Sequence, residues 1–416
     1  MTYSPPKQHL VIGGGGIVGL ALALRVRQLA PALVDVTVCD PGFGAARKSG
    51  RVSTIAAGQR RFLQNLGVWE ELGDAASPVN AMHISDSRLE DVLRPIYLKL
   101  SGEIAPGEAF AHVVSEAPLI AALQRACAET GVNLRAASIT DDRLDGQSRT
   151  ITFPDGATLR ADLLVGADGR PSPIRTRARI GVSGHAYGQS GLVATLQLER
   201  GHGGIAVQHF LPGGPFALLP MAGNRASIVW SQPHAAAQRL MALEPGALAG
   251  EIEACFGHHL GKITLLDRPQ TFPLALGIAR SFVAQRLALA GDAAHGVHPL
   301  AGQGLNLGLA DVVALAEAVS ATARLGLLIG NTETLENYQR ARRAPAVAMA
   351  AAMEGFNALF SNDIVPLRRL RDLGLGLVDR APRLKRRVIQ HAANVTDPKI
   401  TAPKITAPRN APHRPA

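Results

Sequence analysis

Apolar and polar positions along the first forty residues follow the pattern of a strand, a helix and a second strand. Residues 9–12 form a short apolar run, and residues 17–29 carry apolar side chains at helical spacing until Pro31. Residues 34–39 form a second run that is rich in β-branched side chains. The pattern therefore predicts a β-α-β unit of about 30 residues, the size that a dinucleotide-binding fold needs.

The pattern changes midway along the chain and then changes back. The predicted elements are helices at 57–72 and 119–130, a hairpin over 149–159, strands at 163–165, 192–198, 205–211, 216–219, 226–230 and 287–290, and a long helix at 304–325. The central strands are separated by Gly, Pro and Asn turns, which are typical of an antiparallel sheet. We therefore predict an α/β fold in which an antiparallel sheet is inserted into a discontinuous nucleotide-binding domain.

Composition places the chain among globular proteins. Its 416 residues are 47% hydrophobic and 18% charged, which allows one large composite domain or two ordinary ones. The three cysteines, Cys39, Cys127 and Cys255, lie far apart and form no C-x-x-C pair. This spacing argues against a disulfide framework and against zinc, and it fits a reducing cytoplasm.

One segment, residues 10–24, imitates a targeting sequence because it is apolar and is followed by Arg25 and Arg27. A signal peptide has clustered positive charge before its apolar run, whereas Lys7 stands nearly alone here. The run is also too short to span a bilayer. We therefore expect a buried strand and helix in this segment, and no membrane span elsewhere.

The first chemical motif is Gly14-x-Gly16-x-x-Gly19, between the first strand and the first helix. The first glycine permits the tight turn, the second lets the backbone approach a pyrophosphate, and the third lets the helix pack closely on the strand. Asp40 follows roughly 20 residues later, where a carboxylate can bind ribose hydroxyls. The motif predicts a dinucleotide site, with a Gly-rich packing turn as the alternative.

The second motif is Gly166-Ala167-Asp168-Gly169-Arg170, directly after a buried strand. One interpretation is a type I turn with a solvated aspartate. The other is that Asp168, at the carboxyl end of a strand, meets a ligand in the crevice there. The pattern alone leaves both interpretations open.

The third motif is the most specific. It reads Gly291-Asp292-Ala293-Ala294-His295-x-x-x-Pro299-x-Ala301-Gly302-Gln303-Gly304-x-Asn306. The turn at Gly302 enters the long helix, so free backbone N–H groups and the helix dipole point at whatever binds there. His295 and His298 have a spacing that metal ligands can use, but no cysteine or carboxylate cluster completes a site, so no metal is expected.

Together and in this order, the three motifs resemble those of the class A flavoprotein monooxygenases, the para-hydroxybenzoate hydroxylase-like group. Further segments resemble one branch, the ubiquinone-biosynthesis hydroxylases of the UbiH/UbiF type. These segments are 51–58 through 66–69, 214–220, 227–231, 298–308, 359–363 and 373–377. The resemblance extends from about residue 9 to residue 393.

The resemblance implies FAD as the cofactor. The implied cofactor-binding residues are Gly14, Gly16 and Gly19 at the pyrophosphate, Asp40 at the adenosine ribose, Arg51 near the cofactor, Asp168 of the middle motif, Gly291 and Asp292 at the ribityl chain, and Gly302, Gly304, Leu305 and Asn306 beside the isoalloxazine. The candidate catalytic residues are Pro299, Gly302, Gln303 and Gly304.

The chain departs from the family pattern at three positions. Asp40 stands where a glutamate is often found, but it keeps the carboxylate. Ala117 stands where the branch often has asparagine, which leaves the contact of Glu116 open. Ala310 replaces an arginine on the long helix, where the change affects only packing in our interpretation.

The resemblance also implies a reaction. In this group the reduced flavin forms a C4a-hydroperoxide with oxygen, and a ring carbon ortho or para to a phenol attacks its distal oxygen. The protein positions the ring, excludes water and stabilises charge. The implied partners are a polyprenylated phenol, molecular oxygen, NAD(P)H or a reductase as electron donor, and a ubiquinone-biosynthesis complex. No second Gly-rich unit predicts a separate NAD(P)H domain.

Other functions stay open at this point. A hydroxylase of a small soluble aromatic acid would need a cation, for which Arg225 and Arg239 are candidates. An FAD-dependent prenyl reductase and a scaffold subunit that keeps FAD only for stability are further alternatives. For a prenyl tail, the inserted sheet supplies apolar side chains that we expect on its inner face. They are Phe210, Leu211, Phe216, Leu218 and Leu219.

The expected domains follow from these assignments. Residues 1–80, 112–185 and 280–340 form the Rossmann-like FAD-binding domain, and residues 81–111 and 186–279 form the antiparallel-sheet substrate domain. Residues 341–393 form a C-terminal helical region, and the Pro-rich tail at 394–416 is expected to be disordered.

The net charge of +10 is concentrated in residues 366–391, which carry eight Arg or Lys against two Asp. Within them, residues 382–391 are a basic helical candidate. One interpretation is salt-sensitive, peripheral attachment at the inner face of the membrane. The other is a solvated helix that meets the FAD-binding domain or an acidic partner subunit. No basic groove with interleaved aromatic residues indicates nucleic acid.

Overall fold

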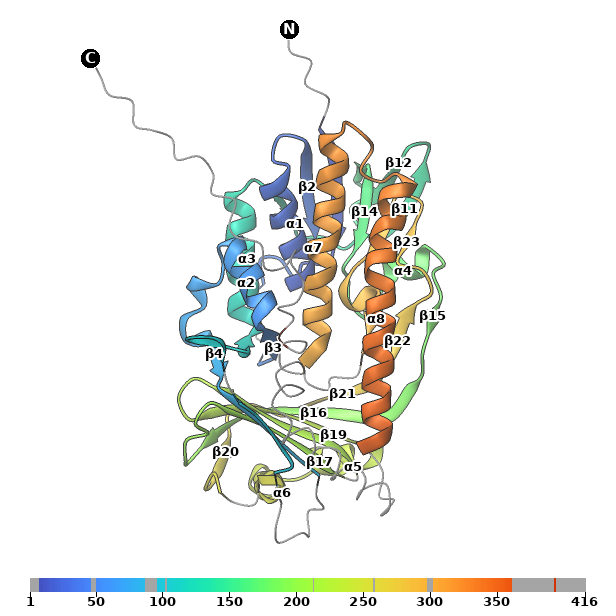
Figure 1. Ribbon diagram of the computed structural model, residues 1–416. Coiled ribbons are helices and arrows are strands. Elements are labelled where there is room, and N and C mark those ends of the chain that lie inside the picture. The colour runs from blue at the N-terminus through green and yellow to red at the C-terminus, as the bar shows by residue number, and fades with distance from the viewer. Residues whose placement is uncertain are drawn as a thin grey trace, which may run out of the picture.

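The structure is a computed structural model, which describes residues 7–45, 50–86, 96–101, 103–211, 213–256, 259–297, 302–360 and residue 393. Figure 1 shows an α/β body above and a broad sheet below, with one long helix, α8, running beside both. The mixture of parallel and antiparallel sheets confirms the predicted α/β class.

The α/β body is built on a six-stranded sheet in the order β10-β2-β1-β14-β24-β23. Its strands are β1 (Gln8–Gly13), β2 (Val34–Cys39), β10 (Asn133–Arg135), β14 (Leu163–Gly166), β24 (Leu287–Leu289) and β23 (Val283–Ala284). All neighbours are parallel except β23 and β24. The neighbouring strands β14 and β24 are wholly apolar and buried because both faces of a parallel sheet are covered.

Helices cover this sheet and complete the larger core. They are α1 (Ile17–Leu29), α2 (Ala57–Leu66), α3 (Glu116–Glu129), α7 (Gln303–Arg324) and α8 (Thr332–Phe360). α1 packs against both α3 and α7, and α7 packs against α8. The segment 10–24 is thus a buried strand, turn and helix, as predicted.

α7 corrects one expectation about membranes. By length and composition it is the one helix in the described part of the chain that could cross a bilayer, although the sequence interpretation expected none. Most of its apolar window is buried inside the protein, where it contacts α1. Its hydrophobicity is therefore accounted for by the core.

The large sheet has eight strands in the order β20-β16-β19-β18-β17-β5-β6, and β21 pairs with β16. These strands are β5 (Ala81–Asp86), β6 (Leu98–Ser101), β16 (Ala186–Leu198), β17 (Ile205–Leu211), β18 (Gly214–Met221), β19 (Arg225–Pro233), β20 (Ile263–Leu265) and β21 (Gln270–Ala275). Only β5 and β17 pair in parallel. The predicted antiparallel sheet is present, and the domain boundaries proposed around it stay a prediction.

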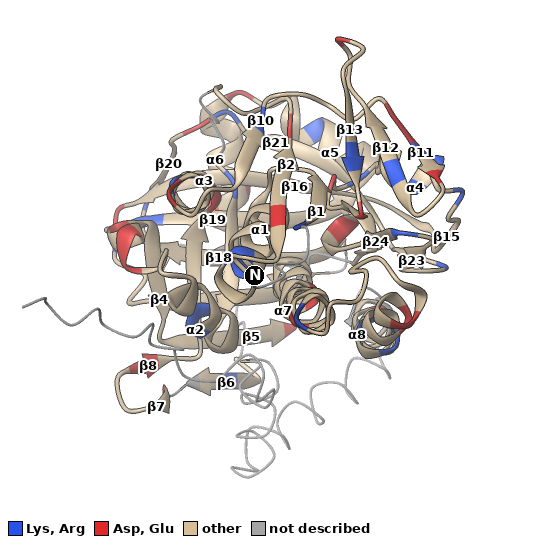
Figure 2. Ribbon diagram, turned by 90° about the horizontal axis from the view of Figure 1, so that it is seen from above, with Lys and Arg blue, Asp and Glu red and all other residues tan. Residues whose placement is uncertain are grey.

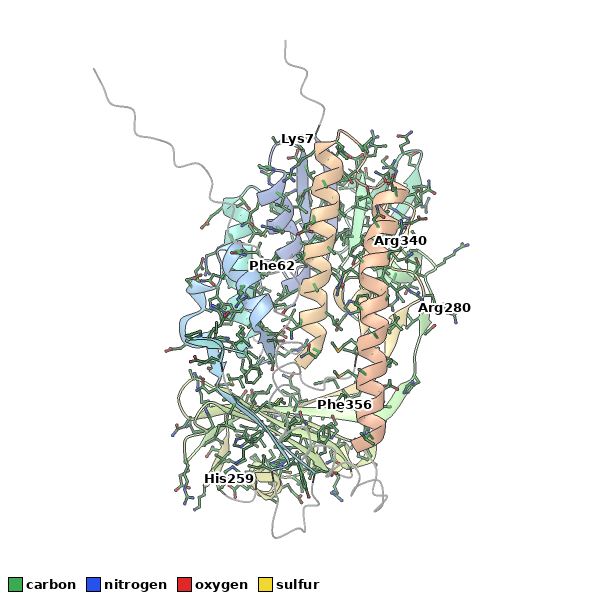
Figure 3. The ribbon with its side chains drawn as sticks, viewed as in Figure 1. Lys7, Phe62, His259, Arg280, Arg340 and Phe356 are labelled. Carbon is green, nitrogen blue, oxygen red and sulfur yellow. The ribbon has the colours of Figure 1, made fainter. Side chains whose placement is uncertain are left out.

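The two faces of the large sheet have different neighbours. One face packs on α5 (His234–Met241) and α6 (Pro245–Phe256) and forms a second core that contains Phe216, Leu218 and Trp230. Figure 3 places His259 on this far side of the sheet and Phe356 at the end of α8 that reaches the sheet. The other face is turned toward the α/β body.

The prediction of an inner-face wall was wrong for most of its residues. Phe216 and Leu218 lie in the second core together with Leu211, and Phe210 packs against Ile84 and Met353. Of the five predicted residues, only Leu219 lines the space between sheet and body. The reason is the two-residue period of a strand, which sends neighbouring side chains to opposite faces.

Smaller elements complete the fold. They are β3 (Val52–Ala56), the 3-10 helix η1 (Glu70–Ala75), β4 (Ala76–Val79), β7 (Glu103–Ala105), β8 (Glu108–Ala109), β9 (Ala111–Ser115), β11 (Asp141–Asp145), β12 (Ser148–Thr152), β13 (Thr158–Ala161), α4 (Pro173–Arg177), β15 (Val182–Ser183), β22 (Gly277–Ala279), the 3-10 helix η2 (Gly291–Ala293) and β25 (His295–Gly296). The predicted helix at 57–72 is shorter than expected because Gly67 ends α2 with a φ of 85°. The predicted hairpin is present as β12 and β13.

Charged residues of both signs are intermixed over the outer elements that the structure describes (Figure 2). The basic helical candidate at 382–391 and the Pro-rich tail lie outside the described residues.

Candidate active site

A cavity of about 1150 Å³ lies between the α/β body and the large sheet. All three sequence motifs contribute to its lining. The predicted site residues that line it are Gly16, Arg51, Asp168, Gly291, Asp292, Gly302, Gln303, Gly304, Leu305 and Asn306. Segments far apart in the sequence therefore meet at one site.

The glycines of the first motif have separate structural roles. A Cβ atom at Gly14, whose φ is 114°, would lie 2.2 Å from the carbonyl oxygen of Ala167. At Gly19 it would lie 2.0 Å from the carbonyl oxygen of Gly14. At Gly16, by contrast, it would meet nothing within 4 Å. Two glycines thus permit packing, and Gly16 presents bare backbone to the cavity.

The N-terminus of α1 is open beside Gly16. No side chain caps this helix end, and its first turn contains no acidic residue. The first N–H groups of a helix have no partners within the helix, and the dipole makes this end positive. This end of the cavity therefore suits a phosphate group.

Asp40 orders the glycine turn. Its carboxylate accepts hydrogen bonds from the backbone N–H groups of Gly15 and Gly42, each at 2.7 Å. Asp40 is not among the residues that line the cavity. Its predicted contact with a ribose stays a prediction.

The second motif combines features of both sequence interpretations. Asp168 accepts a hydrogen bond from the hydroxyl of Ser172 at 2.5 Å and one from the N–H of Ile174 at 3.0 Å, so it orders the start of α4. It also lines the cavity. Arg175 donates to the carbonyl oxygen of Ala293 at 2.8 Å, which ties this motif to the third.

The third motif supplies a second open helix end. Gly302 is the N-cap of α7 with a φ of 62°, and no side chain caps the helix. A Cβ atom at Gly302 would lie 2.8 Å from the Cβ of Thr54. Asp292, in the short helix η2, is exposed on the cavity lining. His298 and Pro299 lie outside the described residues.

The side chain of Asn306 holds the start of α7. Its side chain is buried and binds three backbone groups: the N–H of Ala56 and the carbonyl oxygens of Thr54 and Gly302. The predicted cofactor-binding role of Asn306 stays a prediction, and its contacts indicate positioning of the loop.

Arg51 and Glu116 mark the rim of the cavity. The side chain of Arg51 is 72% exposed, and its Nε lies 3.8 Å from Glu116. Glu116 also accepts a hydrogen bond from Ser53 at 2.7 Å. These are the contacts of Glu116 that the Ala117 departure had left open.

Sequence reasoning missed a buried charged cluster next to the third motif. Asp311 of α7 contacts His295 of β25 at 2.5 Å and Arg342 of α8 at 2.8 Å. A signal was available, since Asp311 interrupts the apolar stripe of α7. A carboxylate on a buried helix face requires polar partners.

The described residues contain no group of three or more His, Cys, Asp and Glu side chains that could hold a metal. The described part of the chain does fit a dinucleotide cofactor. Two uncapped helix ends, those of α1 and α7, open into one cavity, and Gly16 leaves room for a phosphate. The cavity volume lies just above the range of usual single-ligand pockets, about 300–1,000 Å³, which suits a ligand as large as a dinucleotide.

Comparisons with known proteins agree with this geometry. A family model described as FAD binding domain matches residues 7–353. The chain is 41% identical over 385 residues to the ubiquinone hydroxylase UbiL of Rhodospirillum rubrum, which covers 92% of this chain and 89% of that protein. It is 35% identical over 400 residues to the 3-demethoxyubiquinol 3-hydroxylase of Escherichia coli, which covers 94% of this chain and 99% of that protein.

A solved structure shows the same fold. The p-nitrophenol 4-monooxygenase PnpA from Pseudomonas putida matches with a TM-score of 0.78 at 18% identity, covering 97% of this chain and 100% of that chain. The cofactor of this protein is FAD, as the match to the FAD-binding family shows. The chain therefore belongs to the family of FAD-dependent monooxygenases that contains the ubiquinone-biosynthesis hydroxylases, and it is an FAD-dependent hydroxylase.

Proposed function

We propose that this hydroxylase adds an oxygen atom to the ring of a polyprenylated phenol in ubiquinone biosynthesis. The observation that carries the proposal is the apolar surface that the large sheet turns toward the α/β body. The relatives named for ubiquinone hydroxylation, at 35% and 41% identity over most of the chain, support the same substrate class.

We call this surface the cavity floor. It consists of alternate residues of β16 to β19, which are Val193, Ala206, Gln208, Pro215, Ala217, Leu219, Ser227, Val229 and Ser231. The lining continues beyond the floor with Met82, Leu100, Phe110 and Leu274. Apolar contact of this extent suits a hydrocarbon tail, because each buried CH₂ group contributes about 0.8 kcal/mol.

The basic residues of the cavity favour this substrate over a small aromatic acid. Arg225 and Arg239 are not part of the described cavity lining: Arg225 borders a separate cleft of about 200 Å³, and Arg239 is exposed on α5. Four arginines line the cavity: Arg170 and Arg175 donate to backbone carbonyls, Arg51 lies 3.8 Å from Glu116, and Arg268 is exposed. The floor itself contains no cation for a substrate carboxylate.

The protein's contribution to the reaction follows from the two sides of the cavity. FAD, once reduced, supplies the activation of oxygen, and the oxygen intermediate on the flavin stays a prediction. The open N-terminus of α7 stabilises negative charge on the flavin ring. The floor would hold the phenol against that ring, and its apolar side chains would limit the access of water.

Tail length gives the most direct test. We expect kcat/KM for phenols that carry zero, one, two and three isoprene units to rise about tenfold or more per unit until the cavity is filled. Oxygen consumption should match product hydroxylation, which separates a hydroxylase from a prenyl reductase or a scaffold. If a phenol without a tail turns over as well as the prenylated ones, the small-aromatic alternative replaces this proposal.

The ring position requires a second experiment. A strain that lacks this chain should accumulate one quinone precursor, whose mass and fragmentation identify the missing hydroxyl group. The electron donor belongs to the same proposal: either NAD(P)H binds transiently or a partner reductase delivers electrons. Turnover of the purified protein with NAD(P)H alone decides between them.

A membrane-resident substrate also requires a way to reach it. We propose a cytoplasmic protein that attaches peripherally through the basic segment 366–391, which lies outside the described residues. Flotation with neutral and anionic vesicles tests this. Equal binding to both, or unchanged binding of a variant with Arg383, Arg386 and Arg387 reversed to glutamate, favours an acidic partner subunit of a biosynthetic complex instead.

A further inference from the structure

Asp311 is a fully buried carboxylate that joins three elements next to the cofactor site. One carboxylate oxygen accepts the N–H of Gly291 at 3.0 Å and contacts Nε2 of His295 at 2.5 Å. The other accepts a hydrogen bond from Nε of Arg342 at 2.8 Å. One side chain of α7 thus binds the glycine before Asp292, the strand after it, and α8.

Burial and mutual attraction act against each other in this cluster. Burial lowers the pKa of His295, but the attraction and hydrogen bond of Asp311 outweigh this, so the pKa is raised above 6.5. Burial likewise raises the pKa of Asp311, but His295 and Arg342 outweigh it, so that pKa is lowered. The carboxylate of Asp311 and its two partners therefore favour one another's charged forms at this position.

The cluster of Asp311, His295 and Arg342 connects the two halves of the third motif. Gly291 and Asp292 line the cavity, and so do the first residues of α7 from Gln303 to Asn306. Arg342 also donates to the carbonyl oxygen of Leu307, in the same helix. The cluster therefore fixes the turn at Gly291 relative to the open helix end that begins at Gly302.

We propose that Asp311 is a positioning residue for FAD, which sets the Gly291–Asp292 turn against the N-terminal half of α7. This inference rests on the proposed placement of FAD at Asp292 and at the start of α7. The competing explanation is that Asp311 only fastens α7 to α8. The two explanations differ in whether cofactor affinity or only stability depends on the carboxylate.

The chain offers a matched control for helix fastening. Thr322 of α7 and Thr334 of α8 share a buried hydrogen bond of 2.7 Å between their hydroxyl groups. This pair joins the same two helices, but Thr322 lies near the C-terminal end of α7, away from the Gly291 turn. A Thr322→Val variant therefore removes a buried contact between α7 and α8 and leaves the turn intact.

The experiment is FAD titration of the full-length protein after removal of its cofactor, followed by flavin fluorescence, with thermal unfolding measured in parallel. We expect Asp311→Asn to weaken FAD binding at least tenfold. Thr322→Val should lower the unfolding temperature but leave FAD affinity within twofold of the unchanged protein. Equal affinity in Asp311→Asn and the unchanged protein, or equal losses in the two variants, overturns the inference.

A pair of histidine variants protects the test against a folding failure of Asp311→Asn. His295→Gln keeps a side-chain donor for Asp311 and should bind FAD within about threefold of normal, whereas His295→Leu should lose tenfold or more. Equal affinity of the two also overturns the inference. Asp292→Ala distinguishes failure of this inference from failure of the proposed FAD placement. If Asp292→Ala weakens FAD binding and the Asp311 and His295 variants do not, only the positioning role is wrong. If none of these variants weakens FAD binding, the placement of FAD is wrong.

Discussion

Asn306 and Thr54 are joined across 252 residues of sequence by a hydrogen bond of 2.9 Å, in which the amide of Asn306 donates to the carbonyl oxygen of Thr54. The same amide donates to the carbonyl oxygen of Gly302 at 3.0 Å and accepts the N–H of Ala56 at 2.9 Å. The loop at the start of α7 is therefore attached to β3. Its backbone N–H groups are held in a fixed direction, as charge stabilisation requires.

Gly302→Val should disturb this loop more than it disturbs cofactor retention. The backbone at Gly302 has a φ of 62°, and a Cβ atom would lie 2.8 Å from Thr54. We expect a lower flavin reduction potential, or slower reoxidation with less hydroxylation per oxygen consumed, together with a smaller loss of FAD affinity than in Asp292→Ala. Gly250→Val in α6 is the control, because a Cβ there meets nothing within 4 Å and Gly250 does not line the cavity. If a folded Gly302→Val protein keeps the normal flavin reduction potential and the normal yield of hydroxylated product per oxygen consumed, the loop does not stabilise the reduced flavin.

Gly14 and Gly16 should respond in opposite ways to the same substitution. Gly14→Ala places a Cβ atom 2.2 Å from a backbone oxygen at a φ of 114°, so the protein should be strongly destabilised. Gly16→Ala meets no protein atom within 4 Å, so the fold should persist while FAD binding weakens about tenfold or more. Circular dichroism and FAD titration measure the two effects. If the Gly16→Ala protein has normal FAD affinity, the pyrophosphate of FAD does not bind at this turn.

Adjacent residues of β18 should separate stability from substrate binding. Leu218 is fully buried in the second core, so Leu218→Ala should cost about 2–5 kcal/mol of unfolding free energy. Ala217 lines the cavity, so Ala217→Phe should raise KM for a prenylated phenol and change stability by less than about 1 kcal/mol, because the ring enters open space. Urea unfolding and steady-state kinetics test the pair. The reverse pattern means that the two faces are wrongly assigned.

His112 should make stability fall below neutral pH. Burial, followed by the charge of Arg60, lowers its pKa from 6.5 to about 4. Between these values the unfolded chain binds a proton that the folded protein does not, so the free energy of unfolding decreases as the pH falls from 6.5 toward 4. At pH 5 the loss is on the order of 1–2 kcal/mol.

The comparison protein for this measurement is His112→Gln, which cannot titrate. Its free energy of unfolding, from urea curves at pH 7 and pH 5, should fall less than that of the unchanged protein. Trp69, whose ring centroid lies 5.2 Å from that of His112, offers a fluorescence signal for the transition. Parallel losses in the two proteins exclude His112 as the titrating group.

Local patterns predicted the elements that depend on local chemistry. The helix at 17–29 and the strand at 34–39 have the expected bounds because their apolar spacing and Pro31 act within a few residues. The predicted helix at 57–72 ended early, because the left-handed conformation of Gly67 decides that end. The common site of Gly16 and Gly302 was implied by the family resemblance, and both residues line one cavity in the structure.

The contacts that the sequence did not predict join residues that lie far apart in the chain. Asp311, His295 and Arg342 come from three elements, and only the packed fold brings their side chains together. The wall residues of the large sheet were chosen for hydrophobicity, which Phe216 and Leu219 share. The register of β18 decides which of them meets the cavity, and that register is set by its pairing with β17 and β19.

The alternation of the large sheet also separates two kinds of change during evolution. Ala217 and Leu219 can be replaced to fit another ligand while Phe216 and Leu218 keep the sheet attached to α5 and α6. New specificity can then arise from odd-numbered positions of β18 alone, without a compensating change in the core. Ligand specificity and folding stability are thus assigned to different positions of one strand.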